Sequence, residues 1–361
     1  MARTRTPQLP SFFDPLNAGK WSYSPDLRKL FVGAQGYREQ LGIKAASTDK
    51  FKVHLLIIDG QKDFCFPEGT LYVGGRSGTG AVDDSRRIAE FIYRNMGVIS
   101  EITPTMDTHF PFQIFSPSFW LDEAEKPLLP HDMITEDLTI LRMGSPAGKA
   151  MPNPAVAGFI CNGNYSWLRR QAQHYCEALA KGGRYQLYIW PEHCMLGSDG
   201  HALVGVIQEA RMFHSYVRQM QSAAEVKGGN PLTENYSVFS PEVLTRFDGE
   251  APLASKNARF IRTLMDADAT VIAGQAASHC VKSSIDHFLE EILAQDPTLA
   301  KKVYVLRDCT SAVAVPNPAG GFFIDFTPQA EDAFKRYAAA GMNVVNSTDP
   351  IETWPGMKAL A

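Results

Sequence analysis

The chain has 361 residues, of which 45% are hydrophobic and 20% are charged, and its net charge is −4. This composition is typical of a folded protein with a substantial core and excludes a disordered one. No block of like charge suits a nucleic acid or a membrane surface, and no run of 18 apolar residues suits a bilayer. Six scattered cysteines are too few for a disulfide scaffold, so we expect a cytoplasmic protein that binds neither nucleic acid nor membrane.

Apolar runs and amphipathic patterns alternate along the chain. Near-continuous Val, Ile and Leu predict strands that are covered on both faces. The strong candidates are 53–58, 185–189, 269–273 and 302–306, and the weaker ones are 98–106 and 342–345. Helical patterns occupy 25–41, 83–95, 166–181, 203–223, 281–294 and 329–340. The alternation predicts an α/β, Rossmann-like three-layer fold with a mainly parallel sheet of about six strands and helices on both faces.

Reactive side chains follow four of these predicted strands. Cys280 follows the strand predicted at 269–273. It stands where a strand turns into a helix, and a helix N-terminus lowers the pKa of a thiol. The backbone N–H groups of Ala276 and Cys280 are placed to hold a developing oxyanion. The alternative is a buried structural cysteine, since Cys is among the most buried residue types.

Asp59 ends the first strand. A carboxylate leaving an apolar strand is partly desolvated, which raises its pKa and suits it to exchange a proton with a thiol. A turn or N-cap aspartate is the alternative interpretation.

Asp107 and His109 end the weaker strand, and His193 follows the strand predicted at 185–189. One carboxylate and two imidazoles with open positions suit zinc, iron or manganese at a reaction site. An isolated D-x-H is more often a surface turn.

Two further features carry weaker signals. Lys227 by itself is read as a surface lysine. The glycine-rich loop at 74–80 invites a phosphate-loop interpretation, but it lacks the GK[ST] ending and does not follow a strand directly, so a mobile loop is favoured.

Together these segments resemble the isochorismatase-like cysteine hydrolases, and within them the nicotinamidase/pyrazinamidase branch. The matching motifs are IDGQKDFC at 58–65, MDTH at 106–109, WPEHC at 190–194, Lys227 with YSVF at 236–239, and GQAASHCV at 274–281.

The resemblance implies a site. Its triad would be Cys280, Asp59 and Lys227, and Asp107, His109 and His193 would hold a divalent metal, zinc before iron or manganese. It also implies a cis peptide at Gln275–Ala276, and Phe64 and Trp190 as the lining of a pocket for a flat ring.

The resemblance covers 51–109, 185–200, 225–240 and 268–350. We therefore expect an N-terminal extension at 1–50 and a hydrolase domain at 51–361, with an insertion at about 110–184. Three features depart from the pattern. Gly60 replaces an apolar residue, the loop at 67–70 lacks a close pair of glycines, and Gln113 aligns loosely where some nicotinamidases have a further metal histidine.

The implied activity is that of a cysteine amidohydrolase, which releases ammonia from a small nicotinamide-like carboxamide through a Cys thioester. A homo-oligomer is also expected. Two alternatives stay open: another substrate on the same fold (a ureido or maleamate-type amide, or an isochorismate-like compound), or a non-catalytic binding protein. A dinucleotide-binding protein is disfavoured because no G-x-G-x-x-G follows the first strand.

Overall fold

The computed structural model describes residues 9–182 and 186–357. These divide into two compact units. Unit 1 takes the described residues of Met1–Met106, Ala202–Val226 and Ala258–Ala361, and unit 2 takes those of Asp107–His201 and Lys227–Asn257. The predicted insertion at about 110–184 falls within unit 2, and the predicted domain boundaries stay predictions.

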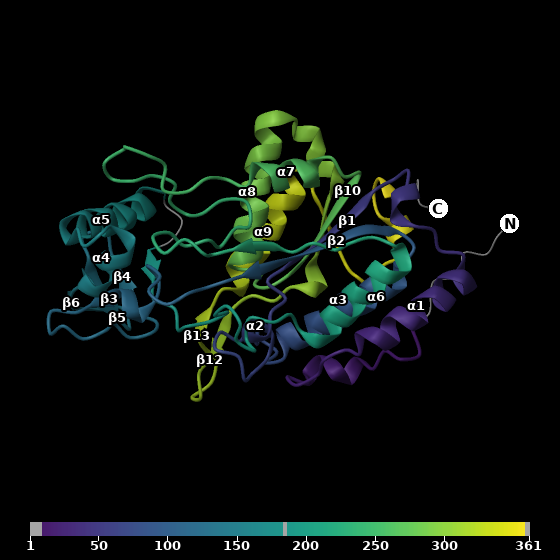
Figure 1. Cartoon of the computed structure of the whole chain (residues 1–361), viewed down its shortest axis with the longest axis horizontal. Coiled ribbons are helices and arrows are strands. Elements are labelled where there is room, and N and C mark those ends of the chain that lie inside the picture. The colour runs from purple at the N-terminus through teal and green to yellow at the C-terminus, as the bar shows by residue number, and fades with distance from the viewer. Residues whose placement is uncertain (1–8, 183–185, 358–361) are drawn as a thin grey trace. The chain divides into compact units, whose positions relative to one another are not determined.

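A six-stranded sheet lies in unit 1, apart from the last residue of two of its strands, which belongs to unit 2 (Figure 1). Its strand order is β14 (Asn343–Val345), β11 (Val303–Leu306), β10 (Ala269–Gly274), β1 (Val53–Ile58), β2 (Ile99–Asp107) and β9 (Glu225–Lys227). The pairings β1–β10, β1–β2, β10–β11 and β11–β14 are parallel. Every residue of β1 and β10 is buried, as their unbroken apolar runs predict. The structure thus confirms the α/β class and the mainly parallel sheet.

One strand prediction is wrong in its place. The segment at 185–189 contributes only β8 (Leu187–Tyr188) to the described structure, and β8 pairs antiparallel with β4 (Met133–Ile134) in a separate sheet of unit 2. The sixth strand of the main sheet is β9 instead. Only one of its three residues is buried, so it has no apolar run that a sequence pattern would detect.

Helices cover both faces of the sheet in unit 1. The helices of unit 1 are α1 (Leu27–Leu41), α2 (Lys62–Cys65), α3 (Gly80–Arg94), α6 (Gly205–Arg218), α7 (Ala258–Met265), α8 (Cys280–Gln295) and α9 (Thr327–Ala339). In Figure 1, α3 and α6 lie on one side of the strands and α7, α8 and α9 on the other. This division follows from right-handed crossovers between parallel strands whose order reverses beside β1.

The predicted N-terminal helix at 25–41 is α1. Its first turn is capped by the Asp26 carboxylate, which accepts hydrogen bonds from two backbone N–H groups, and it ends at Gly42 in the left-handed region. The ring of Phe31 on α1 packs edge-on against Tyr216 of α6. The extension therefore packs on the helical layer of unit 1.

Unit 2 has its own core. Its helices and strands are α4 (Pro154–Ile160), α5 (Tyr165–Gly182), β3 (Trp120–Leu121), β4, β5 (Thr139–Arg142), β6 (Ser145–Lys149), β7 (Met151–Pro152) and β8. A buried apolar cluster that includes Trp120, Ile140, Leu168 and Tyr175 joins most of them, whereas β6 is exposed throughout. Such a cluster is what a compact unit needs in order to exclude water from its interior.

Smaller elements complete the fold. A two-stranded sheet joins β12 (Ala314–Pro316) and β13 (Phe322–Asp325). The 3-10 helices are Pro15–Gly19, Ala46–Thr48, Pro117–Phe119, Pro297–Lys302, Arg307–Cys309 and Ile351–Thr353. Among the helices described, none combines the length and the apolar character that a bilayer crossing requires.

Candidate functional site

Asp59 lies directly after β1 and is fully buried. Its φ of 46° places it in the left-handed region, which a non-glycine residue occupies only where its surroundings hold it. The hydroxyl of Thr105 on β2 supplies that hold, because it accepts from the Asp59 backbone N–H at 2.9 Å and donates to the Asp59 Oδ1 at 2.5 Å. The carboxylate is therefore fixed in one orientation.

The turn that leads to Cys280 is attached to the end of β1. The Gln275 N–H donates to the Ile58 carbonyl at 2.7 Å, and the Gln275 side chain donates to the buried Asp84. Gly274 has a φ of +115°, and a Cβ there would lie 1.9 Å from the Ile58 oxygen, so only glycine fits. The peptide bond between Gln275 and Ala276 is cis, as the resemblance implies.

Cys280 is the first residue of α8 and is buried. Since Ile58 of β1 and Gly274 of β10 are register partners in parallel strands, Asp59 and the Cys280 turn leave the sheet at the same edge. The three residues of the predicted triad divide between the two units: Asp59 and Cys280 belong to unit 1, and Lys227 belongs to unit 2. The assembly of the triad, and of the oxyanion hole at Ala276 and Cys280, stays a prediction.

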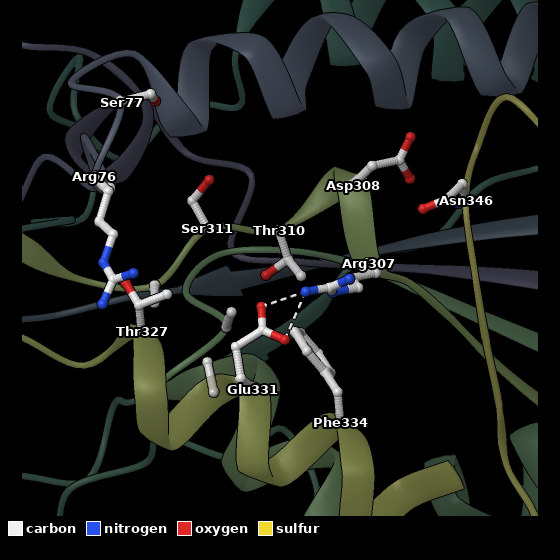
Figure 2. A pocket seen from close by; sticks show the side chains of 14 residues that line it. Arg76, Ser77, Arg307, Asp308, Thr310, Ser311, Thr327, Glu331, Phe334 and Asn346 are labelled. Carbon is white, nitrogen blue, oxygen red and sulfur yellow. Dashed lines mark hydrogen bonds and ion pairs between the residues drawn. The ribbon is translucent and has the colours of Figure 1, made fainter.

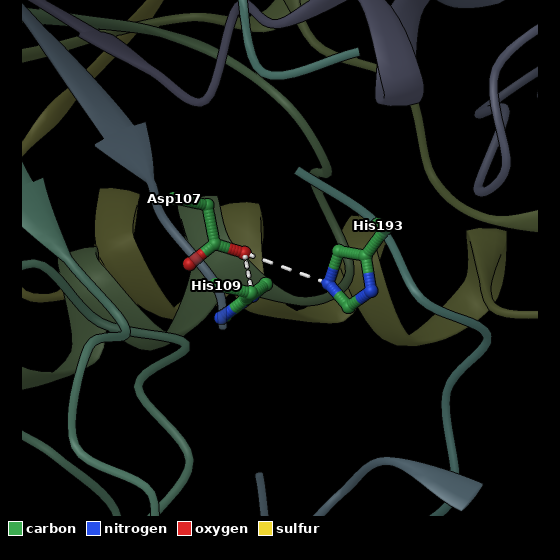
Figure 3. Close-up of side chains that lie close together, drawn as sticks. All are labelled: Asp107, His109 and His193. Atoms are coloured by element: carbon green, nitrogen blue, oxygen red, sulfur yellow. Dashed lines mark hydrogen bonds and ion pairs between the residues drawn. The ribbon is translucent and has the colours of Figure 1, made fainter. Parts of the chain in front are cut away.

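Three predicted metal ligands come together in unit 2 (Figure 3). Asp107, His109 and His193 are all buried, and each offers one ligand atom within 4.8 Å of the others. The Asp107 Oδ2 lies 2.9 Å from the His109 Nε2 and 3.6 Å from the His193 Nε2. In the described part of the chain, this is the one such group of three or more His, Cys, Asp or Glu side chains.

The second nitrogen of each imidazole contacts a carbonyl oxygen. The His193 Nδ1 lies 2.8 Å from the Pro191 oxygen, and the His109 Nδ1 lies 3.3 Å from the Gly228 oxygen. A carbonyl oxygen only accepts, so these contacts favour a hydrogen on each Nδ1, and a neutral ring with that hydrogen presents its Nε2 lone pair to a metal. Two nitrogen lone pairs and a carboxylate then face one another, an arrangement that favours a cation between them.

Gly228 and Gln113 form the wall beside these ligands. A Cβ at position 228 would lie 2.7 Å from the His109 Cε1 and 2.8 Å from the Asp107 Oδ1, so only glycine fits beside these two ligands. The buried amide of Gln113 donates to the Gly228 carbonyl and accepts from the Phe110 N–H. Gln113 therefore supports the backbone around the ligands.

Lys227 is buried, and the interpretation as a surface lysine is wrong. It is the last residue of β9, and its Nζ donates to the Asp107 Oδ1 at 2.9 Å and to the Asn235 carbonyl at 3.0 Å. Burial alone would raise the pKa of Asp107, but the charges of His109 and Lys227 outweigh it and hold that pKa well below its usual range. Asp107 is therefore ionised and can serve as a ligand.

The two imidazoles respond differently to this environment. Burial lowers the pKa of His109 below its usual value, and it outweighs the opposing effect of the Asp107 carboxylate. For His193, burial also disfavours the charged form, but the neighbouring Asp107 carboxylate outweighs it and raises the pKa.

The sequence analysis missed a second carboxyl group, that of Glu234. Burial, followed by the charge of Asp107, raises its pKa to about 8, so a proton is held close to the cluster at neutral pH. Its Oε1 accepts from the Asn235 N–H at 2.8 Å. Its position seven residues after Lys227, just ahead of Tyr236, was the available signal, but Glu at a loop position has no distinctive pattern.

The predicted pocket residues also lie in different units. Phe64 is buried in unit 1. Trp190 lies in unit 2, where its Nε1 donates to the Tyr236 hydroxyl at 2.9 Å and its ring packs 4.3 Å from that of Tyr188. Their joint role in a pocket stays a prediction.

No protein-family model matches the sequence, and no curated protein matches it. Solved structures do show similarity. A nicotinamidase/pyrazinamidase of Acinetobacter baumanii has 16% identity and a TM-score of 0.45, over 84% of this chain and 99% of that chain. The yeast nicotinamidase bound to the inhibitor nicotinaldehyde has 16% identity and a TM-score of 0.46, over 81% and 99%. The pyrazinamidase of Pyrococcus horikoshii in complex with zinc has 16% identity and a TM-score of 0.41, over 82% and 99%.

Proposed function

We propose that this chain is a metal-dependent cysteine amidohydrolase that releases ammonia from a small carboxamide. The observation that carries the proposal is the buried cluster of Asp107, His109 and His193, with Lys227 bound to the same carboxylate. These four residues are the metal and lysine positions of the motifs that resemble the nicotinamidase branch. A buried carboxylate and two neutral imidazoles form a donor set that fits zinc, with iron or manganese as alternatives.

The covalent chemistry belongs to Cys280 and Asp59. Asp59 accepts the proton of the Cys280 thiol, and the thiolate attacks the amide carbon while the backbone N–H groups of Ala276 and Cys280 hold the oxyanion. The C–N bond breaks, Asp59 returns the proton to the nitrogen, and ammonia leaves. Water then cleaves the thioester and yields the carboxylic acid and the free thiol.

Three features support these roles. Thr105 fixes the Asp59 carboxylate, so little reorganisation is needed before proton transfer. Cys280 begins α8, where backbone N–H groups and the helix dipole favour a thiolate. The positive charge of Lys227 would favour the ionic form of the thiolate–carboxyl pair.

Asp107, His109 and His193 would hold the metal. When bound, it would supply a Lewis acid that orients the substrate and the hydrolytic water. Phe64 and Trp190 would line the pocket for a flat aromatic ring, which makes a nicotinamide-like amide the preferred substrate class.

Ammonia release from a panel of amides tests the proposal. The panel holds nicotinamide, pyrazinamide, a maleamate-type amide and a ureido compound, each assayed with and without a chelator. Cys280→Ala should abolish ammonia release and leave metal content unchanged, whereas Cys161→Ser, a control at a half-buried cysteine of unit 2, should retain the rate. An unaltered rate in Cys280→Ala would contradict the nucleophile assignment.

A labelling experiment separates the enzyme from a binding protein on the same fold. Iodoacetamide at neutral pH should alkylate Cys280 faster than the other cysteines if its thiolate is populated. Failure of every amide in the panel, together with an unreactive Cys280, would favour the non-catalytic alternative.

A further inference from the structure

A cavity of about 340 Å³ opens in unit 1, formed by residues that the proposed reaction does not use (Figure 2). Its volume lies within the range of about 300–1,000 Å³ that is usual for small-molecule sites. Arg307 lies directly after β11, and Asn346 directly after β14, so the cavity lies at the carboxyl end of two parallel strands. Ligands of parallel α/β sheets bind at this edge.

The cavity also takes in the glycine-rich loop at 74–80. Gly75, Arg76 and Ser77 of this loop line it, opposite the first turns of α9. Gly75 has a φ of +60°, and its neighbour Gly74 accepts a hydrogen bond from the Gly80 N–H, which closes the loop into a turn. The loop is therefore part of a formed wall.

The carboxylates around the cavity are already engaged. Glu331 accepts from the Nη2 of Arg307 at 2.6 Å with both of its oxygens. Asp308 accepts from the backbone N–H and the hydroxyl of Ser347. Asp325, which is not among the lining residues, accepts from Arg76.

The groups that remain unused are mainly donors. Among the described residues, nothing accepts from the Nε or Nη1 of Arg307, or from the Nη1 of Arg76. The Thr310 hydroxyl is also without a hydrogen-bond partner there, although only 7% of this residue is exposed. Figure 2 shows the Thr310 side chain between Ser311 and Glu331, pointing into the ring of labelled residues.

Hydrogen-bond donors without a protein partner favour a ligand that accepts hydrogen bonds. The Arg307 and Glu331 side chains are 51% and 38% exposed, and an exposed ion pair of this kind contributes little, so an incoming anion can share or replace Glu331. A guanidinium presents a fork of N–H groups that matches a carboxylate or a phosphate.

We propose that this cavity, which we call the Arg307 cavity, binds the oxyanion group of a small molecule, a carboxylate or a phosphate. Arg307 and Arg76 pair with the anion, and the Thr310 hydroxyl donates to it. This site shares no residue with the Asp107 cluster and does not depend on the amidohydrolase proposal.

The test is calorimetric titration of the full chain with inorganic phosphate and, separately, with acetate, at constant ionic strength. At least one of them should bind saturably, and the better of the two identifies the source of the oxyanion. Arg307→Gln and the near-isosteric Thr310→Val should each weaken binding by about tenfold, as for loss of a hydrogen bond to a charged group. Glu331→Gln should tighten binding because it releases Arg307.

Asp332→Asn is the matched control. It removes the same charge from the same helix, but this exposed carboxylate pairs with Lys335 and does not line the cavity. Its affinity should equal that of the wild type. The inference is overturned if neither anion binds saturably, if Arg307→Gln and Thr310→Val bind like the wild type, or if Asp332→Asn changes affinity as much as Glu331→Gln. Should Arg307→Gln fail to fold, the other variants carry the same test.

Discussion

Gly228→Ala should weaken metal binding although position 228 supplies no ligand side chain. The added Cβ would lie 2.7 Å from the His109 Cε1, 2.8 Å from the Asp107 Oδ1 and 3.0 Å from the His109 Nδ1. Carbon contacts are comfortable only at about 3.5–4.0 Å, so the ligands or the backbone must move by several tenths of an ångström. Metal sites tolerate shifts of about 0.2 Å in ligand distance.

The magnitude has two parts. Gly228 has a φ of +88°, and forcing alanine into this region costs about 1–2 kcal/mol of folding stability. Displacement of the ligands should reduce metal affinity by about 10- to 100-fold, the usual effect of disturbing the groups that support a metal site.

Gly229→Ala is the control for this prediction. Its Cβ would meet only the Phe110 Cε2 at 3.6 Å, an ordinary contact, and its backbone lies outside the left-handed region. Zinc affinity should be measured by competition with a chromophoric chelator, and thermal unfolding of the metal-free protein reports the strain separately. Wild-type affinity in Gly228→Ala, or an equal loss in Gly229→Ala, would refute the reasoning.

Three further predictions concern single buried groups. Thr105→Val removes the hydroxyl that donates to Asp59, so kcat/KM for ammonia release should fall by roughly 10- to 100-fold while the metal content stays the same. An unchanged kcat/KM would show that this hydrogen bond does not position the base. In the metal-free protein, the pKa of Glu234 is about 8, whereas it is 4.5 in the unfolded chain. The folded state therefore retains the proton between these pH values, and the stability of the wild type should fall as pH rises from 4.5 to 8. Thermal melts of Glu234→Gln should lack this fall, and equal slopes in both proteins would contradict it. Burial lowers the pKa of His54 to about 4 from 6.5, so the unfolded chain takes up the proton first and stability should decrease by about 3 kcal/mol as pH falls from 6.5 to 4. Urea unfolding of His54→Gln across this range should show a shallower pH dependence, and an unaltered dependence would exclude His54 as a contributor.

Much of the sheet was predictable because burial of a strand requires apolar residues that are adjacent in the sequence. β1 and β10 are buried on both faces, so both consist of apolar runs that a local pattern detects. β8 misled the prediction for the same reason: its apolar residues belong to the core of unit 2, and an apolar run does not reveal which sheet a strand joins. β9 has no apolar run that would predict a strand, since Lys227 is its one buried residue.

The candidate site follows the same division. Asp107, His109 and His193 were identifiable because carboxylate and imidazole side chains at strand ends are uncommon and chemically distinctive. Glu234 and Gly228 were not, because their importance comes from what lies against them: the Asp107 charge beside the buried carboxyl, and the imidazole that leaves no room for a Cβ.

The sequence by itself determined the α/β class, the order of most strands along the chain, and the residue types available for chemistry. Each of these depends on local composition, periodicity or neighbouring residues. The tertiary structure alone decided that Lys227 is a buried partner of Asp107, and that Arg76, Arg307 and Thr310 line one cavity. Asp107 and Lys227, like Arg76 and Arg307, are more than a hundred positions apart, and long-range packing fixes such distances without leaving a pattern in any one segment.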